Sequence, residues 1–362
     1  MISRSPRATP PRPKRERRST RPSFGDRALA RLTDAELLQM RFADLPIRID
    51  GTPLEDRIQR MHDELQLKGL RFRPHFWLST DWFSPDGIPG VAIPFYLAHP
   101  RLMQLEEAQM LEIEGGTEES CLRILRHEIG HAIDNAYRLR RRVLWKRAFG
   151  SPSQPYPEFY TPRPFSKSYV HHLQAWYAQS HPAEDFAETF AVWLKPRSDW
   201  RTRYEGWAAL KKLKYVDGLM REIRTQTPKQ RTRMRVEPLR SVRKTLQDHY
   251  HERRSFYGID LPRNLDRDLL RLFARGEAGA TNGRSAAAFL RRVRARLRED
   301  VADWTGEYQY TIDEVLRDMI DRCEVLALRL DRPDAEVERQ ILIVLTMHVM
   351  NYLNAGYHRI AL

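Results

Sequence analysis

Cysteine is nearly absent from this chain of 362 residues, which contains only Cys121 and Cys323. Two cysteines do not build a disulfide scaffold, and they lack the paired spacing of a cysteine-rich zinc site. The same scarcity is compatible with a reducing compartment, so we expect a cytoplasmic protein.

Long hydrophobic runs are also lacking. The longest apolar run, residues 341–353, contains His348 and Asn351 and is too short to span a bilayer. The N-terminal tail has no hydrophobic signal core, so secretion by that route is not supported. With 41% hydrophobic residues and a mean hydropathy of -0.64, the chain has enough apolar residues for real cores. We expect a soluble chain with no membrane span.

Acidic residues are scarce in two stretches that carry the excess of positive charge. Residues 1–23 hold eight basic residues and one acid, and residues 221–254 hold eleven basic residues and four acids. Each stretch carries +7, and together they account for the net charge of +14. The first stretch also holds five prolines, so we predict that residues 1–30 are disordered. The second is either a solvated basic helix face or a contact for nucleic acid or another polyanion.

Residues 127–131 read His-Glu-Ile-Gly-His and are the most informative pattern present. On a helix, His127 and His131 project from one face about 6 Å apart, which suits two imidazole nitrogens on one zinc ion. Glu128 is placed to reach a metal-bound water as a general base. The pattern predicts a zinc hydrolase with one Zn²⁺ per chain, most often a peptidase.

The surrounding residues predict a strongly periodic helix for this motif. Thr117 is a suitable N-cap, and Glu118 and Glu119 lie in the first turn, where the helix dipole favours anions. Apolar residues recur at helical spacing along it, namely Leu122, Leu125, Ile129, Ile133 and Ala136. The alternative is a surface helix with two unrelated histidines.

A hydrolytic zinc site needs a third protein ligand. Asp134 and Tyr137 stand where the extended metzincin pattern has glycine and histidine, so that class is excluded. A carboxylate on a later helix remains, and residues 181–196 predict such a helix, with Glu184 as the ligand. Glu188, one turn on, is placed to accept a hydrogen bond from a ligating histidine. The alternative is an amphipathic helix with a solvated acidic face.

Other residues near the second helix have competing interpretations. His171, His172 and His181 are rival ligands, although each is more typical of a loop or cap histidine. The loop of residues 150–168 holds five prolines and four aromatic residues. It either borders the cleft or is a structural connection.

The two segments together resemble the gluzincins, zinc peptidases with two histidines and one glutamate. They are most similar to the group that contains anthrax lethal factor and the bacterial Pro-Pro endopeptidases. The resemblance carries over from residues 127–134 and 183–190, under a quarter of the chain when the flanking residues are included. It implies that Glu184 is the third ligand and that Tyr177, seven residues earlier, stabilises the oxyanion. A phenolic hydroxyl is a suitable donor for that purpose. We also consider Asp134 as a residue that orients a histidine ligand.

The expected fold class is α+β, with a zincin-like domain over residues 31–200 and an all-helical domain over residues 201–362. Strands are predicted near residues 47–49, 71–79 and 91–98. Pro94 places the last of these at a sheet edge, where it either holds an extended substrate or is an ordinary edge strand. Helices are predicted at about 203–225, 239–256, 263–275, 284–299, 311–326 and 334–354. We expect the last helix to be buried on several sides.

The sequence thus predicts a zinc metalloendopeptidase that acts on a protein or peptide. Two alternatives from other classes stay open. One is a catalytically inactive relic of the zincin fold that works as a binding protein. The other is a nucleic-acid-associated protein that uses residues 221–254. The sequence does not define the substrate or the oligomeric state.

Overall fold

The structure is a computed structural model that describes residues 28–354, apart from 158–159, 161, 165, 175, 258–264 and 276–283. Residues 1–27 of the tail predicted to be disordered lie outside the described residues. The larger part of the structure contains α2 (Asp34–Gln39), α3 (Pro53–Leu67), β1 (His75–Ser79), β2 (Gly90–Pro94), α4 (Pro100–Met110), α5 (Glu118–Tyr137), α6 (Val143–Phe149), α7 (Pro182–Leu194), α8 (Trp200–Arg203), α9 (Ala209–Ile223) and α10 (Leu246–Tyr257). Short 3-10 helices lie at η1 (Phe42–Asp44), η2 (Phe95–Ala98), η3 (Leu139–Arg141), η4 (Tyr177–Gln179) and η5 (Leu239–Ser241).

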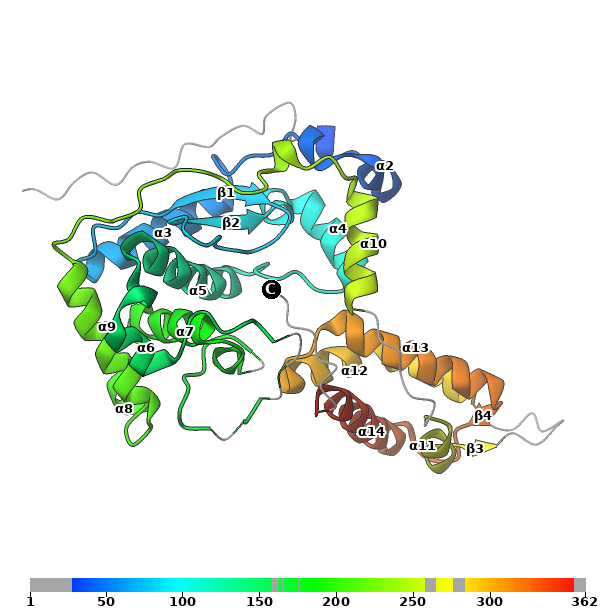
Figure 1. Ribbon diagram of the computed structural model, residues 1–362. Coiled ribbons are helices and arrows are strands. Elements are labelled where there is room, and N and C mark those ends of the chain that lie inside the picture. Colours follow the sequence, from blue (N-terminus) through cyan, green and yellow to red (C-terminus); the bar gives the residue numbers. More distant parts are fainter. Residues whose placement is uncertain are drawn as a thin grey trace, which may run out of the picture.

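The smaller part contains α11 (Leu265–Leu272), β3 (Ala274–Arg275), α12 (Ala286–Thr305), α13 (Gln309–Val325), β4 (Leu328–Arg329) and α14 (Asp334–Asn354). Figure 1 shows these helices beside the larger part, below the end of α10. The described residues are mostly helical with a small sheet, consistent with the α+β class. In its described residues, the smaller part has helices and the two short strands β3 and β4, which pair antiparallel over two residues each.

The two helices predicted to carry the zinc ligands begin at the predicted residues. The Thr117 side chain accepts the Ser120 N–H at 3.1 Å and caps α5, which ends at Arg138 in the left-handed region with φ 54°. His181 caps α7 by accepting the Ala183 N–H at 3.1 Å, and Pro182 occupies the first turn. These ends are fixed by contacts between near neighbours in the sequence, which is why the sequence predicts them.

The small sheet differs from the prediction. β1 and β2 are parallel, with His75 opposite Gly90 and Ser79 opposite Pro94. All five residues of β2 are buried, and the Ala92 N–H donates to the Phe83 carbonyl at 2.8 Å. The expectation that this strand holds substrate at an exposed edge is therefore wrong. The predicted strand at residues 47–49 is also wrong, because the Ile47 N–H is bonded locally to the Leu45 carbonyl.

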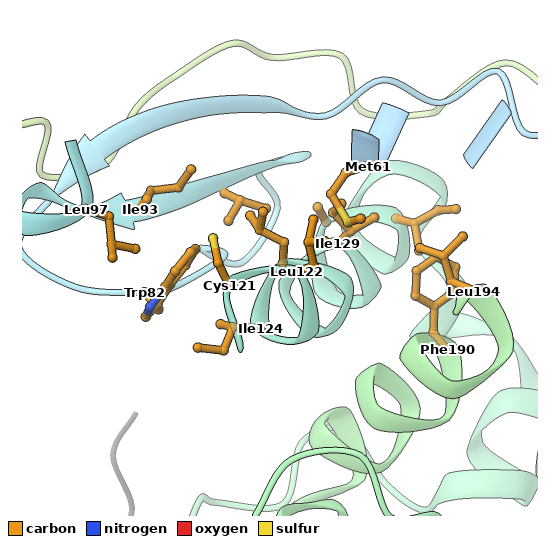
Figure 2. Close-up of a cluster of buried hydrophobic side chains, with 14 of the residues drawn as sticks. Met61, Trp82, Ile93, Leu97, Cys121, Leu122, Ile124, Ile129, Phe190 and Leu194 are labelled. Carbon is orange, nitrogen blue, oxygen red and sulfur yellow. The ribbon is translucent and has the colours of Figure 1, made fainter. Parts of the chain in front are cut away.

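Helix α5 lies at the centre of the main hydrophobic core. In Figure 2, Leu122 and Ile129 of α5 lie between the strand residue Ile93 and the α7 residues Phe190 and Leu194. All five side chains are buried. Burial of this kind is the dominant stabilising contribution to the fold, so the helix that carries the motif is held rigidly from both sides.

A buried ion pair fixes α5 against α3. The Arg126 guanidinium donates from Nε to one oxygen of Glu64 at 2.7 Å and from Nη2 to the other at 2.8 Å. Both residues are buried. The paired geometry fixes orientation as well as distance, so the turn of α5 just before His127 is held in place.

The basic stretch is not one helix face. We call residues 225–238, between α9 and α10, the basic strap; Figure 1 shows this segment crossing over β1. The Val236 carbonyl accepts from Trp77 Nε1 at 2.9 Å, and the Glu237 carbonyl accepts from Ser79 Oγ at 2.7 Å. The strap is therefore docked by its backbone. Its arginines are exposed, namely Arg231, Arg233 and Arg235.

The hydrophobic cores do not divide at residue 200. The first core includes Leu213 and Met220 of α9 and Leu246 of α10, whereas the second is built from Leu265 onward. α9 and α10 therefore pack with the larger part. α14 packs in a helical bundle as predicted, with Ile341 and Leu345 buried, but Ile343 on another of its apolar faces is 67% exposed. No helix in the described part of the chain is long and apolar enough to cross a bilayer.

Candidate metal centre

Three side chains from two helices converge on one point. The Nε2 atoms of His127 and His131 lie 3.1 Å apart, and each lies 3.0 Å from Oε2 of Glu184. Among the residues that the structure describes, these three form the one group of histidine, cysteine and acidic side chains that could hold a metal ion. The structure thus brings together the three residues that the sequence predicts as ligands.

The three donor atoms fit a zinc ion. Bonds of about 2.0–2.2 Å in tetrahedral geometry place neighbouring ligand atoms roughly 3.2–3.6 Å apart. The observed separations are 3.0 to 3.1 Å, so the donor atoms would move apart by about a few tenths of an ångström when zinc binds. Two imidazoles and one carboxylate are a donor set that zinc hydrolases use. His127 and Glu184 are buried, so water competes little for their donor atoms.

Glu188 orients the first histidine. Its Oε1 lies 2.8 Å from Nδ1 of His127, and its Oε2 accepts the Leu173 N–H at 2.8 Å. A carboxylate acceptor at Nδ1 favours the tautomer that carries its proton there, which leaves the Nε2 lone pair free for a metal. The contact is the one that the sequence predicts for Glu188.

Tyr156 is a residue that the sequence analysis missed. Its hydroxyl donates to Oε1 of Glu184 at 2.7 Å, while Oε2 of the same carboxylate faces the histidines. The Tyr156 ring stacks on the ring of His181, the N-cap of α7, with centroids 3.8 Å apart. The aromatic loop of residues 150–168 thus reaches the metal centre and positions the Glu184 carboxylate. The sequence left open whether this loop borders the cleft or is a structural connection, and no spacing rule singled out Tyr156.

The charges of the three converging side chains compensate one another. Burial disfavours protonated His127, yet the carboxylates of Glu184 and Glu188 raise the pKa of this histidine well above its usual value. Burial also disfavours ionised Glu184, but His131 and His127 lower its pKa well below the usual range. The carboxylate is therefore ionised at neutral pH, as a metal ligand must be.

Glu128 and Tyr177 lie beside the three converging side chains and line one cavity with His127. Burial raises the pKa of Glu128, which brings it closer to the range useful for a general base. Burial, followed by the charge of Glu184, raises the pKa of Tyr177 well above 10. Its hydroxyl stays protonated and is a permanent donor. The Tyr177 ring centroid lies 5.5 Å from that of His127.

Asp134 does not act as predicted. Its carboxylate accepts the Arg140 N–H at 2.7 Å and Arg140 Nε at 2.6 Å, an arrangement that fixes the end of α5. The physical reason is the left-handed turn at Arg138, which brings Arg140 back toward the helix. Two of the three rival histidines contact backbone instead of the centre: His172 Nε2 lies 2.9 Å from the Arg123 carbonyl oxygen, and His181 Nε2 lies 2.9 Å from the Gln154 carbonyl oxygen. The ring of the third, His171, lies 5.7 Å from that of Trp207.

The helices that carry the three converging side chains approach each other closely at Gly130. A Cβ atom added there would lie 2.8 Å from Cα and 3.1 Å from the carbonyl oxygen of Ala187. Such contacts are too short for real side chains, so only glycine permits this approach. The near contact sets the distance between α5, which holds the histidines, and α7, which holds Glu184.

Comparison with known proteins agrees with this centre. Residues 117–254 match the model of a family described as "putative zinc-binding metallo-peptidase". The match covers less than half of the chain and includes both helices of the centre. It supports a zinc metallopeptidase in general, which acts on proteins or peptides. Searches of the curated proteins and of the solved structures found no match.

Proposed function

We propose that the chain is a zinc-dependent endopeptidase of gluzincin type. In this proposal His127, His131 and Glu184 hold zinc, and the larger part of the structure, through α10, is a zincin-like catalytic unit. The observation that carries the proposal is the convergence of the three donor atoms within 3.0 to 3.1 Å of one another. The family match, confined to residues 117–254, supports the same class.

The reaction divides among the residues by their chemistry. When bound, zinc lowers the pKa of a coordinated water toward about 7 and polarises the scissile carbonyl. Glu128 takes a proton from the attacking water at its carboxylate and delivers it to the leaving amine. Its raised pKa makes the carboxylate a stronger base for the first of these transfers.

Two tyrosines have distinct tasks in this proposal. Tyr177 donates its hydroxyl proton in a hydrogen bond to the carbonyl oxygen as negative charge develops there. Tyr156 and Glu188 are positioning residues, because each contacts a ligand: Tyr156 the Glu184 carboxylate and Glu188 the His127 imidazole. Substitution of a positioning residue should weaken zinc binding, whereas Tyr177→Phe should leave it unchanged.

The first experiment measures zinc content and affinity in the purified full chain. We expect one zinc per chain in wild type and a loss of at least roughly tenfold in affinity for Glu184→Ala, since one of three ligands is removed. Glu107→Ala is the matched control, because Glu107 is exposed on α4. A wild-type chain that binds no zinc after reconstitution would overturn the proposal in favour of an inactive relic.

The second experiment uses Glu128→Gln to separate binding from catalysis. We expect this variant to retain zinc and to cleave a peptide library at least roughly a hundredfold more slowly, which is the usual contribution of a general base. Cleavage at the wild-type rate would remove Glu128 from its proposed task. The nucleic-acid alternative stays a prediction: it requires salt-dependent binding that is lost when Arg231, Arg233 and Arg235 are neutralised.

A further inference from the structure

One cavity connects the metal centre with the helical part of the chain. Its volume is about 320 Å³, and it is bordered by Glu128 and Tyr177 on one side. On the other side it is bordered by Asp303 near the end of α12 and by Glu307 between α12 and α13. The two parts of the molecule therefore enclose a space next to the atoms proposed to react.

The cavity is lined by more acidic than basic side chains. Six of its lining residues have carboxyl groups, and Arg123 is the one lysine or arginine among them. The acids are Asp81, Glu112, Glu114, Glu128, Asp303 and Glu307. The side chain of Glu114 has no hydrogen bond or ion pair with the described residues, and burial together with Asp81 raises its pKa to about 8. A cation in the cavity would favour the ionised carboxylates and be stabilised by them.

Aromatic side chains form the rest of the wall. Tyr257 and Tyr308 both line the cavity and stack with centroids 4.4 Å apart. Tyr160, Tyr177 and Trp82 add further rings. Aromatic faces attract ammonium and guanidinium groups, so the walls combine two elements that recognise an organic cation.

Trp82 supplies an observation independent of the acids. The residue is 5% exposed, lines the cavity, and its Nε1 has no hydrogen-bond partner among the described residues. Figure 2 shows its nitrogen turned away from the strands. A buried N–H without an acceptor is uncommon, and a peptide carbonyl would satisfy it. The wall thus includes a buried N–H without an acceptor beside the acceptors for a cation.

A second metal ion fits this cavity less well. Within the described ranges, no group of its carboxylates brings ligand atoms together as the zinc ligands do. Carboxylates spread around a space suit an extended cation with several hydrogen-bond donors better than a small ion.

We propose that this cavity is a subsite for a lysine or arginine side chain of the peptide substrate, adjacent to the scissile bond. The inference rests on the proposed peptidase function for the identity of the ligand. It assigns a task to the helical part, which contributes Asp303 and Glu307 to the selection of substrate.

Binding tests the subsite without any turnover. The probe is a pair of peptide mixtures, acetyl-Xaa-Xaa-Arg-Xaa-Xaa-amide and the same mixture with neutral citrulline in place of arginine. Binding to the full-length, zinc-loaded Glu128→Gln chain is measured by calorimetry at low salt. We expect the arginine mixture to bind about tenfold more tightly, which is the order expected for a partly buried charge pair. Equal affinities for the two mixtures would overturn the inference.

Two double variants locate the effect. In Glu114→Gln/Asp303→Asn, added to the same background, the preference for arginine should fall to near unity. In the control Glu107→Gln/Asp300→Asn it should persist, because these residues are exposed on α4 and α12 and do not line the cavity. Thermal melting of each variant checks the fold. An unchanged preference in a folded Glu114→Gln/Asp303→Asn chain would also overturn the subsite.

Cleavage of a randomised peptide library by the wild-type chain separates the two proposals. Enrichment of lysine or arginine at one position beside the cleaved bond supports both. Cleavage without that enrichment would support the proposed peptidase activity and contradict the proposed subsite. Absence of cleavage would contradict the proposed peptidase activity. The ratio of the affinities for the arginine and citrulline mixtures would then be the remaining test of the subsite.

Discussion

At the scale of single residues, His249 is a buried histidine that the proposed reaction does not use. It is 4% exposed, and its ring lies edge-on to Phe42 at a centroid distance of 5.1 Å and near Phe95 at 5.8 Å. Burial, aided by the charge of Arg253, lowers its pKa to about 2. The folded chain therefore holds this imidazole neutral, whereas the unfolded chain protonates it below a pH of about 6.5.

This difference predicts a pH dependence of stability. Because the unfolded state binds the extra proton, the free energy of unfolding should decrease as pH falls below about 6.5, by roughly 1.4 kcal/mol per pH unit from this residue. Between pH 7 and pH 5 the wild type should lose about 2 kcal/mol more than His249→Phe. Urea unfolding at several pH values measures the difference. His251→Phe, an exposed neighbour on α10, should follow the wild type, and parallel curves for wild type and His249→Phe would contradict the prediction.

At the scale of secondary-structure elements, the contact between α5 and α7 sets the geometry of the metal centre. Gly130→Ala would place a methyl group 2.8 Å from Ala187 Cα. The helices must then move apart, and the free energy of unfolding should fall by about 1–3 kcal/mol. Since α7 carries Glu184, zinc affinity should fall in the same variant. Chemical unfolding and zinc titration measure the two effects.

Gly218 is the matched control for this substitution. It lies inside α9, and a Cβ added there meets no atom within 4 Å. Gly218→Ala should raise the free energy of unfolding by about 0.4–1 kcal/mol, because alanine loses less backbone entropy on folding. A Gly130→Ala chain that is as stable as Gly218→Ala and binds zinc normally would show that the close approach is unimportant.

Local contacts within the secondary-structure elements explain which of their features the sequence predicts. Helices α5 and α7 follow from caps and apolar repeats within a few residues, as at Thr117 and Pro182, so their ends were predictable. The contact of Glu188 with His127 followed from helical spacing and metal chemistry. Tyr156 reaches Glu184 across 28 residues of chain through a loop without periodicity, and no local rule predicts such a contact. The residues after Pro94 form η2 (Phe95–Ala98) instead of extending β2, and all four of them are buried.

At the scale of the whole molecule, one buried polar network links the larger part to the helical part. Arg253 of α10 donates from Nη1 to Glu106 of α4 at 2.6 Å and from Nη2 to the Tyr308 hydroxyl at 3.1 Å. Tyr250 donates to the other oxygen of Glu106 at 2.8 Å. Tyr308 directly precedes α13. The network thus fixes the wall on which the proposed subsite depends.

Removal of the Arg253 guanidinium from this network should lower the free energy of unfolding. Arg253→Leu leaves Glu106 buried without its ion pair, which typically destabilises a protein by about 3–5 kcal/mol. The exposed pair of Lys244 and Glu252, 2.7 Å apart, supplies the comparison: Lys244→Met should cost less than about 1 kcal/mol. Chemical unfolding measures both variants. Equal, small losses would mean that the network does not hold the two parts together.

The sequence did not predict where the two hydrophobic cores divide. Strand signals fade after residue 200, and this change in composition suggested a boundary there. The structure instead folds α9 and α10 onto the first core, since Met220 and Leu246 find their apolar partners in the larger part. Contacts between segments far apart in the chain decide such a division, and composition does not report them.

The region that matches the known family begins at the cap of α5 and ends inside α10. A protein trimmed to those limits would lose β2, which covers Leu122, and α3, whose Glu64 pairs with Arg126. The limits of similarity therefore do not coincide with the limits of folding. Anyone who produces the metal centre in isolation should retain the chain from α2 through α10, because the residues that surround the histidines are drawn from both sides of the recognisable segment.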